Sequence, residues 1–443
     1  MTHSSDHTPD HNDPGPEGGA AASASTIQAL EFVYNDPSIS NKDEVSPDAE
    51  LVLNATIKDD RVPKTFAKAM WHSDAPLWKD STDAEIQALL ENGTWELERL
   101  PPGEKAIGSC WVFQIKLHSD GSLDKYKSCL VAKGYTQQPG IDYNEVFAPT
   151  MWWAALRMIL AQGALRRAHI ESIEISNAYL KRVLDSDACI YMQQPEGYHQ
   201  GGVDWVCRLK KGLYRLKQSR RLCYKWLGVA LEGMEFKCLK SNPSIYIWMN
   251  DTTKIIIPIF VDDLTLVSDS KQDLDQAKDE LGKIFKLKDL GPTTSLLGVE
   301  VTYDHSQKTL KLLQRQYIQE ILEQFKMSNC QPISMPMSLG QCLNSSMGPS
   351  TPEEIEDMQN IPYLNVVGVL NYLAIATWPD ITYAVGCLAQ FNSNPGPVHW
   401  AAVKHLLCYL QGTINLSLTF APDPSTESFQ MWTDADHRDV VIK

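Results

Sequence analysis

Apolar and polar positions alternate in two recognisable periods from about residue 64 onward. The apolar runs 254–260 and 264–267 are separated by Val261-Asp262-Asp263, and they predict two buried strands joined by a tight turn. The β-forming segments 110–117 and 125–132 flank Ser119-Asp120-Gly121, a pattern typical of a β-hairpin. Further strands are expected at 94–97, at 170–175 and within 290–302.

Other segments have helical periodicity. In 314–325 the apolar residues fall on one helical face. The sequence Thr82-Asp83-Ala84-Glu85 fits a capping box and predicts a helix over 83–91 that ends at Asn92-Gly93. Ser176 is placed to cap a helix that follows a strand. Mixed helices, strands and hairpins favour the α+β class, with further helices expected at 363–376 and 399–410.

Composition separates the first 60 residues from the rest of the 443-residue chain. They hold twelve Asp or Glu and two Lys among many Pro, Gly and Ser residues, which predicts disorder. No basic cluster precedes an apolar stretch near the start, and no apolar run reaches roughly 18 residues, so neither secretion nor a membrane span is expected. The ten cysteines form no C-x-x-C pair, which favours reduced thiols in the cytoplasm or nucleus.

The net charge of −15 is unevenly distributed. Residues 206–231 carry eight basic residues and no acidic one, with Tyr214, Tyr224 and Trp226 interleaved among them. Cations bind phosphates and aromatic rings stack on bases, so this segment predicts a groove for nucleic acid or nucleotides. A solvated helix face is the plainer interpretation of the same run.

Asp262-Asp263 is the part of the sequence that most clearly indicates a chemical function. Flanking buried strands would hold the two carboxylates at a hairpin tip, and carboxylate oxygens are the ligands that magnesium prefers. Two such ions can stabilise the attacking and leaving oxygens of a phosphoryl transfer. A third carboxylate is available on the strand 170–175, where Glu174 stands near the end and Glu171 near the start. The alternative for each acid is an exposed surface carboxylate.

Short blocks of sequence occur in a fixed order along the chain: Asn92-Gly93-Thr94-Trp95-Glu96-Leu97, Trp111-Val112-Phe113, Lys127, Leu130-Val131-Ala132-Lys133-Gly134, Phe147-Ala148-Pro149, Ala178-Tyr179-Leu180, Ile190-Tyr191-Met192, Leu213-Tyr214, Leu216-Lys217-Gln218, Phe260-Val261-Asp262-Asp263, Asp289-Leu290-Gly291 and Leu297-Gly298-Val299-Glu300. In this order they resemble the reverse transcriptase region of copia-type long-terminal-repeat retrotransposon polyproteins. The resemblance extends over about residues 64–438.

That resemblance implies an α+β right-hand polymerase fold with fingers, a ferredoxin-like palm and a thumb. It divides the chain into a disordered acidic segment at 1–60, a reverse transcriptase domain at 61–345, a connection-like helical segment at 346–425, and a truncated ribonuclease H first strand at 426–443. Asp434 would lie on that last strand. A complete ribonuclease H site is not expected, because the chain stops at Lys443.

The implied function is RNA-directed DNA synthesis. The family copies an RNA or DNA template-primer with deoxynucleoside triphosphates and two Mg²⁺ ions, which Mn²⁺ can replace. The expected location is the cytoplasm, within a virus-like particle, or the nucleus.

The resemblance also assigns site residues. Glu174, Asp262 and Asp263 are the implied catalytic and metal-holding carboxylates. The implied nucleotide-binding residues are Lys127, Tyr179, Tyr214, Lys217 and Gln218. The implied nucleic-acid-binding residues are Arg208, Lys210, Lys211, Arg220, Arg221, Lys225 and Gly298.

The sequence departs from the family at several of these positions. Glu174 replaces an aspartate, which moves the carboxylate by about an ångström, whereas magnesium tolerates little geometric error. Cys129 replaces an arginine of the fingers, and Arg215 replaces a glycine. Three hypotheses follow: an active polymerase, an inactive remnant that at most binds nucleic acid, and an interaction protein that uses its acidic N-terminal segment.

Overall fold

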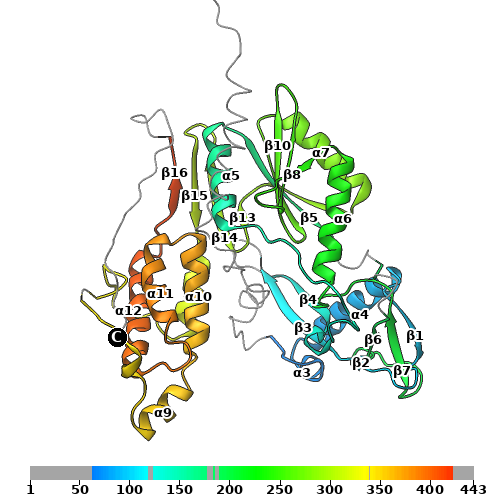
Figure 1. Ribbon diagram of the computed structural model, residues 1–443, viewed down its shortest axis with the longest axis horizontal. Helices are drawn as coiled ribbons and strands as arrows, with labels where there is room; N and C mark the ends of the chain where they lie inside the picture. The colour runs from blue at the N-terminus through cyan, green and yellow to red at the C-terminus, as the bar shows by residue number, and fades with distance from the viewer. Residues whose placement is uncertain (1–61, 118–122, 177–182, 185–188, 339, 423–443) are drawn as a thin grey trace, which may run out of the picture.

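The computed structural model describes residues 62–117, 123–176, 183–184, 189–338 and 340–422 (Figure 1). Helices and strands are mixed along this part of the chain, so the predicted α+β class is confirmed. The predicted disordered segment at 1–60, Tyr179, and the predicted ribonuclease H strand with Asp434 lie outside the described residues. No helix among the described residues is long and apolar enough to cross a membrane.

A six-stranded antiparallel sheet forms the centre of the molecule, and we call it the central sheet. Its strand order is β12-β5-β11-β10-β9-β8. The principal elements β5, α6, β10, β11, α7 and β12 follow one another as β-α-β-β-α-β, with the four strands ordered β12-β5-β11-β10, which is the ferredoxin-like arrangement. The strands are β5 (His169–Ile175), β8 (Lys237–Cys238), β9 (Ile245–Met249), β10 (Lys254–Phe260), β11 (Asp263–Ser268) and β12 (Leu287–Pro292).

Each face of the central sheet is covered by different elements because alternate side chains point to opposite faces. Ile255, Ile257 and Ile259 of β10 pack in one core with helices α6 (Ser219–Gly233) and α7 (Lys271–Ile284). Ile256 packs in a second core with helix α5 (Trp153–Leu165) and the strands β13 (Ser295–Leu296), β14 (Val299–Asp304) and β15 (Thr309–Leu313). The two faces can therefore serve different purposes along the same strands.

The N-terminal part of the described chain builds a smaller unit around the hairpin β3–β4. Trp111 and Phe113 of the hairpin pack against α4 in a separate core. The predicted capping box is wrong, because α4 begins at Ala75 with Pro76 in its first turn and Thr82 lies buried within the helix. The elements are α3 (Phe66–Met70), α4 (Ala75–Glu91), β1 (Trp95–Arg99), β2 (Ala106–Ile107), β3 (Ser109–Leu117), β4 (Leu123–Ala132), β6 (Tyr191–Met192) and β7 (Trp205–Leu209).

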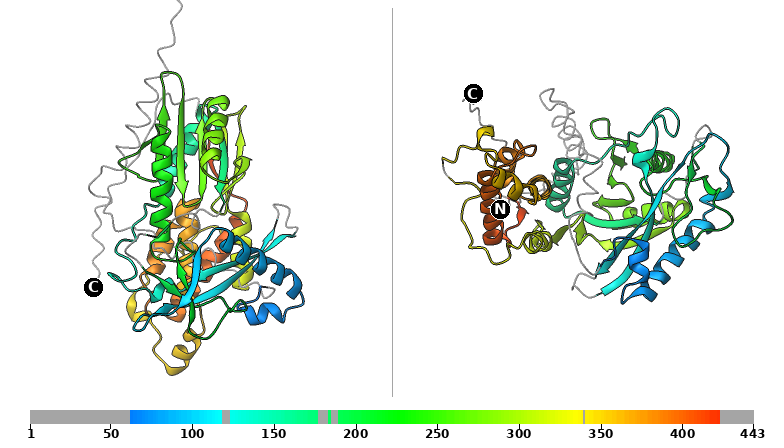
Figure 2. Two further views of the ribbon diagram at one scale, coloured as in Figure 1. Left: turned by 90° about the vertical axis from the view of Figure 1, so that its right-hand side faces the viewer. Right: turned by 90° about the horizontal axis from the view of Figure 1, so that it is seen from below.

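The C-terminal part of the described chain is mainly helical. Seen from below, its helices gather beside the central sheet, with α5 between the two groups (Figure 2). The predicted apolar face of α8 is confirmed, since its Ile318 and Ile321 share one core with α10, α11 and α12. The elements are β13 (Ser295–Leu296), β14 (Val299–Asp304), β15 (Thr309–Leu313), α8 (Arg315–Gln324), α9 (Pro352–Gln359), α10 (Tyr363–Ala376), α11 (Thr382–Ala389), α12 (Pro397–Thr413) and β16 (Leu418–Phe420).

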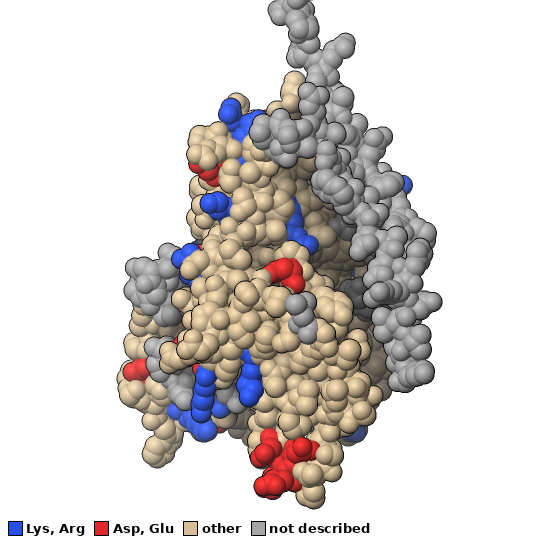
Figure 3. Space-filling model, turned by 90° about the vertical axis from the view of Figure 1, so that its left-hand side faces the viewer, with Lys and Arg blue, Asp and Glu red and all other residues tan. Residues whose placement is uncertain are grey.

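Acidic side chains gather at the lower end of the molecule, where α9 lies (Figure 3). Glu353 and Glu354 occupy the first turn of α9, and Glu354 completes a capping box with Thr351. Carboxylates in the first turn stabilise a helix through its dipole. This acidic group therefore has a structural explanation.

Candidate carboxylate site

The predicted hairpin joins β10 to β11 through a two-residue turn. Phe260 pairs with Asp263 across the hairpin, so Asp263 already belongs to β11 and the tip consists of Val261 and Asp262 alone. Val261 has φ of 60°, a left-handed conformation that is an outlier for a β-branched residue. Such strain persists only where the surrounding strands impose it, and it is concentrated at functional sites.

Glu174 lies directly across the sheet from Asp263. The two residues are register partners of the antiparallel strands β5 and β11, so their side chains share one face with Cβ atoms roughly 5 Å apart. The carbonyl of Asp262 accepts a hydrogen bond of 2.8 Å from the backbone N–H of Ile175, which fixes the turn against the end of β5. The fold therefore brings the three sequence-predicted carboxylates to one end of the sheet.

The surroundings of Glu174 are cationic. Its side chain is 37 % exposed, and the Nζ of Lys288 on β12 lies 3.9 Å from its Oε2. Lys116 of the hairpin β3–β4 is a second cation within electrostatic range of this carboxylate. Burial, with repulsion from Lys127, lowers the pKa of Lys116, and attraction to Glu174 opposes that change.

Lys116 is a neighbour of the site that the sequence reasoning missed. Cross-strand pairing joins Gln114 to Lys127 and Lys116 to Lys125, which puts these side chains on one face of the hairpin together with Cys129. The opposite face carries the buried Trp111 and Phe113. Period-two alternation in 110–117 was the signal that could have revealed this cationic face.

The turn that carries Arg215 is also strained. Arg215 has φ of 65°, a conformation that suits the glycine of the family better than arginine. Gly134 packs directly on the carbonyl of Arg215, and a Cβ on Gly134 would clash with it. The carbonyl of Tyr214 accepts a hydrogen bond of 3.0 Å from the N–H of Ala132. Burial raises the pKa of the Tyr214 hydroxyl far above its usual range, and the charges of Cys129, Glu85, Asp262 and Glu174 add to this.

Lys217 and Gln218 follow Tyr214 and Arg215 in the chain, just before α6 begins at Ser219. The buried amide of Gln218 bonds the side chain of Gln137 at 3.2 Å and donates to the carbonyl of Asp142 at 3.0 Å. The N–H of Lys217 donates to Gln137 at 2.9 Å, while its side chain is exposed. Gln218 therefore ties two loops together, and the Lys217 ammonium group points to solvent.

Several cations of the predicted basic groove form ion pairs with acidic residues that lie far away in the sequence. Lys210 pairs with Glu96 at 2.8 Å and Arg208 with Glu98 at 3.6 Å across the strands β1 and β7. Two further predicted cations have partners of their own: Lys211 donates to the carbonyl of Asn92, and Arg221 pairs with Glu145. Lys225 is exposed on α6, and Gly298 lies with φ of 78° in the turn between β13 and β14.

The other glutamate of β5 has a different environment. Glu171 points to the opposite face of the central sheet and is 7 % exposed, with Lys271 Nζ at 2.7 Å and Lys278 Nζ at 2.5 Å. Lys278 also bonds both oxygens of Asp289, at 2.8 and 2.9 Å. Although burial opposes it, hydrogen bonds from the two lysines hold the pKa of Glu171 below its ordinary value.

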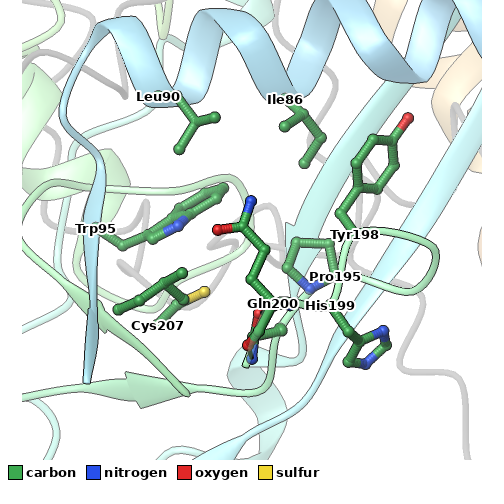
Figure 4. Close-up of a pocket in the computed structure, with 10 residues that line it drawn as sticks. Ile86, Leu90, Trp95, Pro195, Tyr198, His199, Gln200 and Cys207 are labelled. Atoms are coloured by element: carbon green, nitrogen blue, oxygen red, sulfur yellow. Dashed lines mark hydrogen bonds between the residues drawn. The ribbon is translucent and has the colours of Figure 1, made fainter. Parts of the chain in front are cut away.

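A cavity of about 380 Å³ lies in the N-terminal unit, between α4, β1 and the loop after β6. Figure 4 shows Ile86, Leu90 and Trp95 on one side and Tyr198, His199 and Gln200 on the other. No sequence-predicted site residue lines it. The carboxylate end of the central sheet is therefore separate from this cavity.

The three carboxylates match magnesium in chemistry, since all their donors are hard oxygens. Within the described residues, no group of three acidic, histidine or cysteine side chains gathers at the spacing of one metal ion. Backbone register thus brings the residues to one end of the sheet, whereas ion binding requires their side chains to turn toward a common point.

Residues 92–339, more than half of the chain, match the family described as "Reverse transcriptase (RNA-dependent DNA polymerase)". The chain belongs to this family. Within it, the sequence is the reverse transcriptase region of a copia-type retrotransposon Pol polyprotein, as the blocks of sequence predicted.

Curated relatives support this assignment. The chain is 36 % identical over 393 residues to the Retrovirus-related Pol polyprotein from transposon TNT 1-94 of Nicotiana tabacum, covering 88 % of this chain and 29 % of that protein. It is 33 % identical over 394 residues to the corresponding polyprotein from transposon RE1 of Arabidopsis thaliana, covering 88 % and 26 %. The chain thus spans less than a third of the length of either polyprotein.

One solved structure matches 75 % of this chain and 48 % of its own, at 12 % identity and a TM-score of 0.37. Its title is "Structure of the foamy viral protease-reverse transcriptase dRH in complex with ds DNA".

Proposed function

We propose that the chain is an RNA-directed DNA polymerase whose nucleotidyl transfer takes place at Glu174, Asp262 and Asp263. The proposal rests on the register of β5 and β11, which sets Glu174 opposite Asp263, next to the turn of Val261 and Asp262 in which Val261 is strained. Three carboxylates, two on the adjacent strands β5 and β11 and one in the turn before β11, would hold two Mg²⁺ or Mn²⁺ ions. When bound, the ions supply charge stabilisation for the attacking and leaving oxygens.

In this proposal the central sheet is the palm and the hairpin β3–β4 belongs to the fingers. The cationic hairpin face, with Lys116, Lys125 and Lys127, would bind the triphosphate of the incoming nucleotide, because ammonium groups bind phosphate. Lys217, whose side chain is exposed, would add a further phosphate contact. The partner is a template-primer of RNA or DNA.

The length of the side chain at position 174 determines the rate of synthesis that we expect. Its carboxylate is one methylene farther from the backbone than an aspartate, while Asp263 opposite keeps the shorter reach. Catalytic groups must lie within about 0.5 Å of the productive geometry, so we expect slow synthesis and a gain in the Glu174→Asp variant.

The second candidate function is nucleic-acid binding without synthesis. Two observations favour it: the described carboxylates do not gather at metal spacing, and Lys116 and Lys288 accompany Glu174. Binding would use the exposed Lys225 and the predicted cations of 208–221, whose ion pairs with Glu96, Glu98 and Glu145 would have to open. Its affinity would fall steeply with salt, because phosphate contacts release counterions.

Primer extension on a primed RNA template separates the two candidates. The full chain, its Asp262→Asn variant and its Glu174→Asp variant are compared at saturating Mg²⁺ and deoxynucleotides. Asp275→Asn is the matched control, since it removes an exposed carboxylate of α7 that pairs with Lys271 on the same helix.

We expect slow extension by the chain, at least a roughly 100-fold loss in Asp262→Asn, and unchanged rates in Asp275→Asn. Glu174→Asp is expected to be faster than the natural sequence. Extension that survives Asp262→Asn would contradict the assigned site. No extension by any variant, together with salt-sensitive template binding, would establish the second candidate instead.

A further inference from the structure

Two cysteines from distant parts of the sequence meet on the C-terminal unit. Cys330 follows the end of α8 in a turn closed by its N–H, which bonds the carbonyl of Met327 at 3.0 Å. Cys408 lies on α12. The two thiols are in hydrogen-bonding contact with each other, and both are free and half-buried.

Backbone contacts on both sides of the pair fix this meeting. The N–H of Ile333 donates to the carbonyl of Cys408 at 3.3 Å. One turn later on α12, a Cβ on Gly412 would lie 3.1 Å from the Cβ of Pro332. The segment after α8 therefore lies closely along α12, and this placement of the backbone brings Cys330 beside Cys408.

The elements that carry the pair are held together by a common core. α8 contributes Ile321 and Leu322 to the apolar cluster, and α12 contributes Leu406, Leu407 and Leu410. A bond between Cys330 and Cys408 would join α12 to the segment that follows α8, two parts of the chain that already lie against each other.

We propose that Cys330 and Cys408 form a reversible disulfide, with a low-molecular-weight disulfide such as oxidised glutathione as the oxidant. The Cys408 thiolate attacks one sulfur of the oxidant and releases one reduced glutathione. The Cys330 thiolate then attacks the Cys408 sulfur of the mixed disulfide and releases the second. Two protein thiols are oxidised to one disulfide while one glutathione disulfide is reduced to two thiols, so electrons and protons balance.

Burial, with the hydrogen bond to Cys408, raises the pKa of Cys330 to about 11. The thiolate is the attacking species in disulfide exchange, so the second step is slow at neutral pH and accelerates as the pH rises. The bond would close a long loop that contains α9, α10 and α11, and cross-links of long loops restrict the unfolded chain most.

The test uses the full chain with and without oxidised glutathione, after which free thiols are blocked with N-ethylmaleimide. Cleavage after methionine with cyanogen bromide and after lysine with trypsin separates the cysteines of this region. Cys330 then falls in peptide 328–335, Cys342 in 338–347, Cys387 in 359–404 and Cys408 in 405–431.

We expect a disulfide-linked species of peptides 328–335 and 405–431, formed faster at pH 9 than at pH 7 and removed by dithiothreitol. The oxidised chain should unfold at a temperature about 5 °C higher. Cys408→Ser is expected to abolish both effects, whereas the matched control Cys342→Ser, which changes an exposed cysteine of the same unit, should keep them.

Peptide 328–335 recovered only as its glutathione or maleimide adduct would overturn the proposal. So would its linkage to peptide 338–347 or 359–404. These readouts involve no DNA synthesis, so they stand apart from the proposed polymerase activity.

Discussion

Glu171 and Glu174 stand three residues apart on the same strand, yet they lie in opposite kinds of environment. Glu171 is buried under α7 and bonded to two lysines, one of which also binds Asp289. Glu174 is half-exposed on the other face, opposite Asp263, and its ion pair with Lys288 is longer, at 3.9 Å.

This difference shows that the two faces of one strand can carry different roles, one in stability and the other in the proposed chemistry. Odd spacing sends the two side chains to opposite faces of the sheet. A carboxylate neutralised by nearby ammonium groups has little left to offer a metal ion, whereas a half-exposed carboxylate beside other acids keeps that capacity. The strained residue Val261 lies in the turn next to the register pair of Asp263 and Glu174, at the opposite end of β5 from Glu171.

The largest effect on stability is expected from Glu171→Gln. Removing one charge from a buried, hydrogen-bonded ion group leaves Lys278, which is 8 % exposed, with one carboxylate fewer, and should cost about 3 kcal/mol of unfolding free energy. Urea denaturation measures this. Asp275→Asn removes a 53 % exposed partner of the same Lys271 and should cost less than about 0.5 kcal/mol. Equal costs would show that the buried ion group contributes no more to stability than an exposed ion pair.

Lowering the pH should remove the stability that the same buried ion group contributes. The pKa of Glu171 is lower in the folded chain than its ordinary value near 4.5, so its contribution is fully present above that value. The contribution is lost as the pH falls from about 4.5 through the folded-state pKa. The stability gap between the natural chain and Glu171→Gln should therefore narrow between pH 5 and pH 3. A gap that stays constant over this range would show that the charge of Glu171 contributes nothing.

A smaller effect on stability, with the opposite sign, is expected from a substitution at Arg215. Arg215→Gly relieves a left-handed φ and should stabilise the chain by roughly 1 kcal/mol. Lys217→Gly, two residues on in the same turn and without a positive φ, is the control and should destabilise or leave stability unchanged. If both glycine variants behave alike in urea denaturation, backbone strain at Arg215 is not the cause.

Local patterns predicted the strands of the site well. The apolar runs around Asp262 and the β-hairpin at 110–132 were recovered because alternation and turn residues are encoded within a few positions. The capping box at Thr82 failed because the same four-residue pattern occurs inside a longer helix whose start is set by Pro76.

Long-range partners could not be predicted in the same way. The basic run at 206–231 lacks acids locally, but strand pairing brings Glu96 and Glu98 from more than a hundred residues away. The alignment of Glu174 with Asp263, and the place of Lys116 beside it, likewise depend on sheet register and hairpin packing. The assignment of these residues to catalysis stays a prediction.

Manganese binding by the full chain is the most direct test of the claim that Glu174 helps to hold the metal ions. Free Mn²⁺ is followed by electron paramagnetic resonance at a temperature far below the melting temperature of every variant. The account predicts that Glu174→Gln weakens Mn²⁺ binding at least about 10-fold, while Glu171→Gln on the opposite face leaves it unchanged. Equal affinity in the natural chain and in Glu174→Gln would contradict the account.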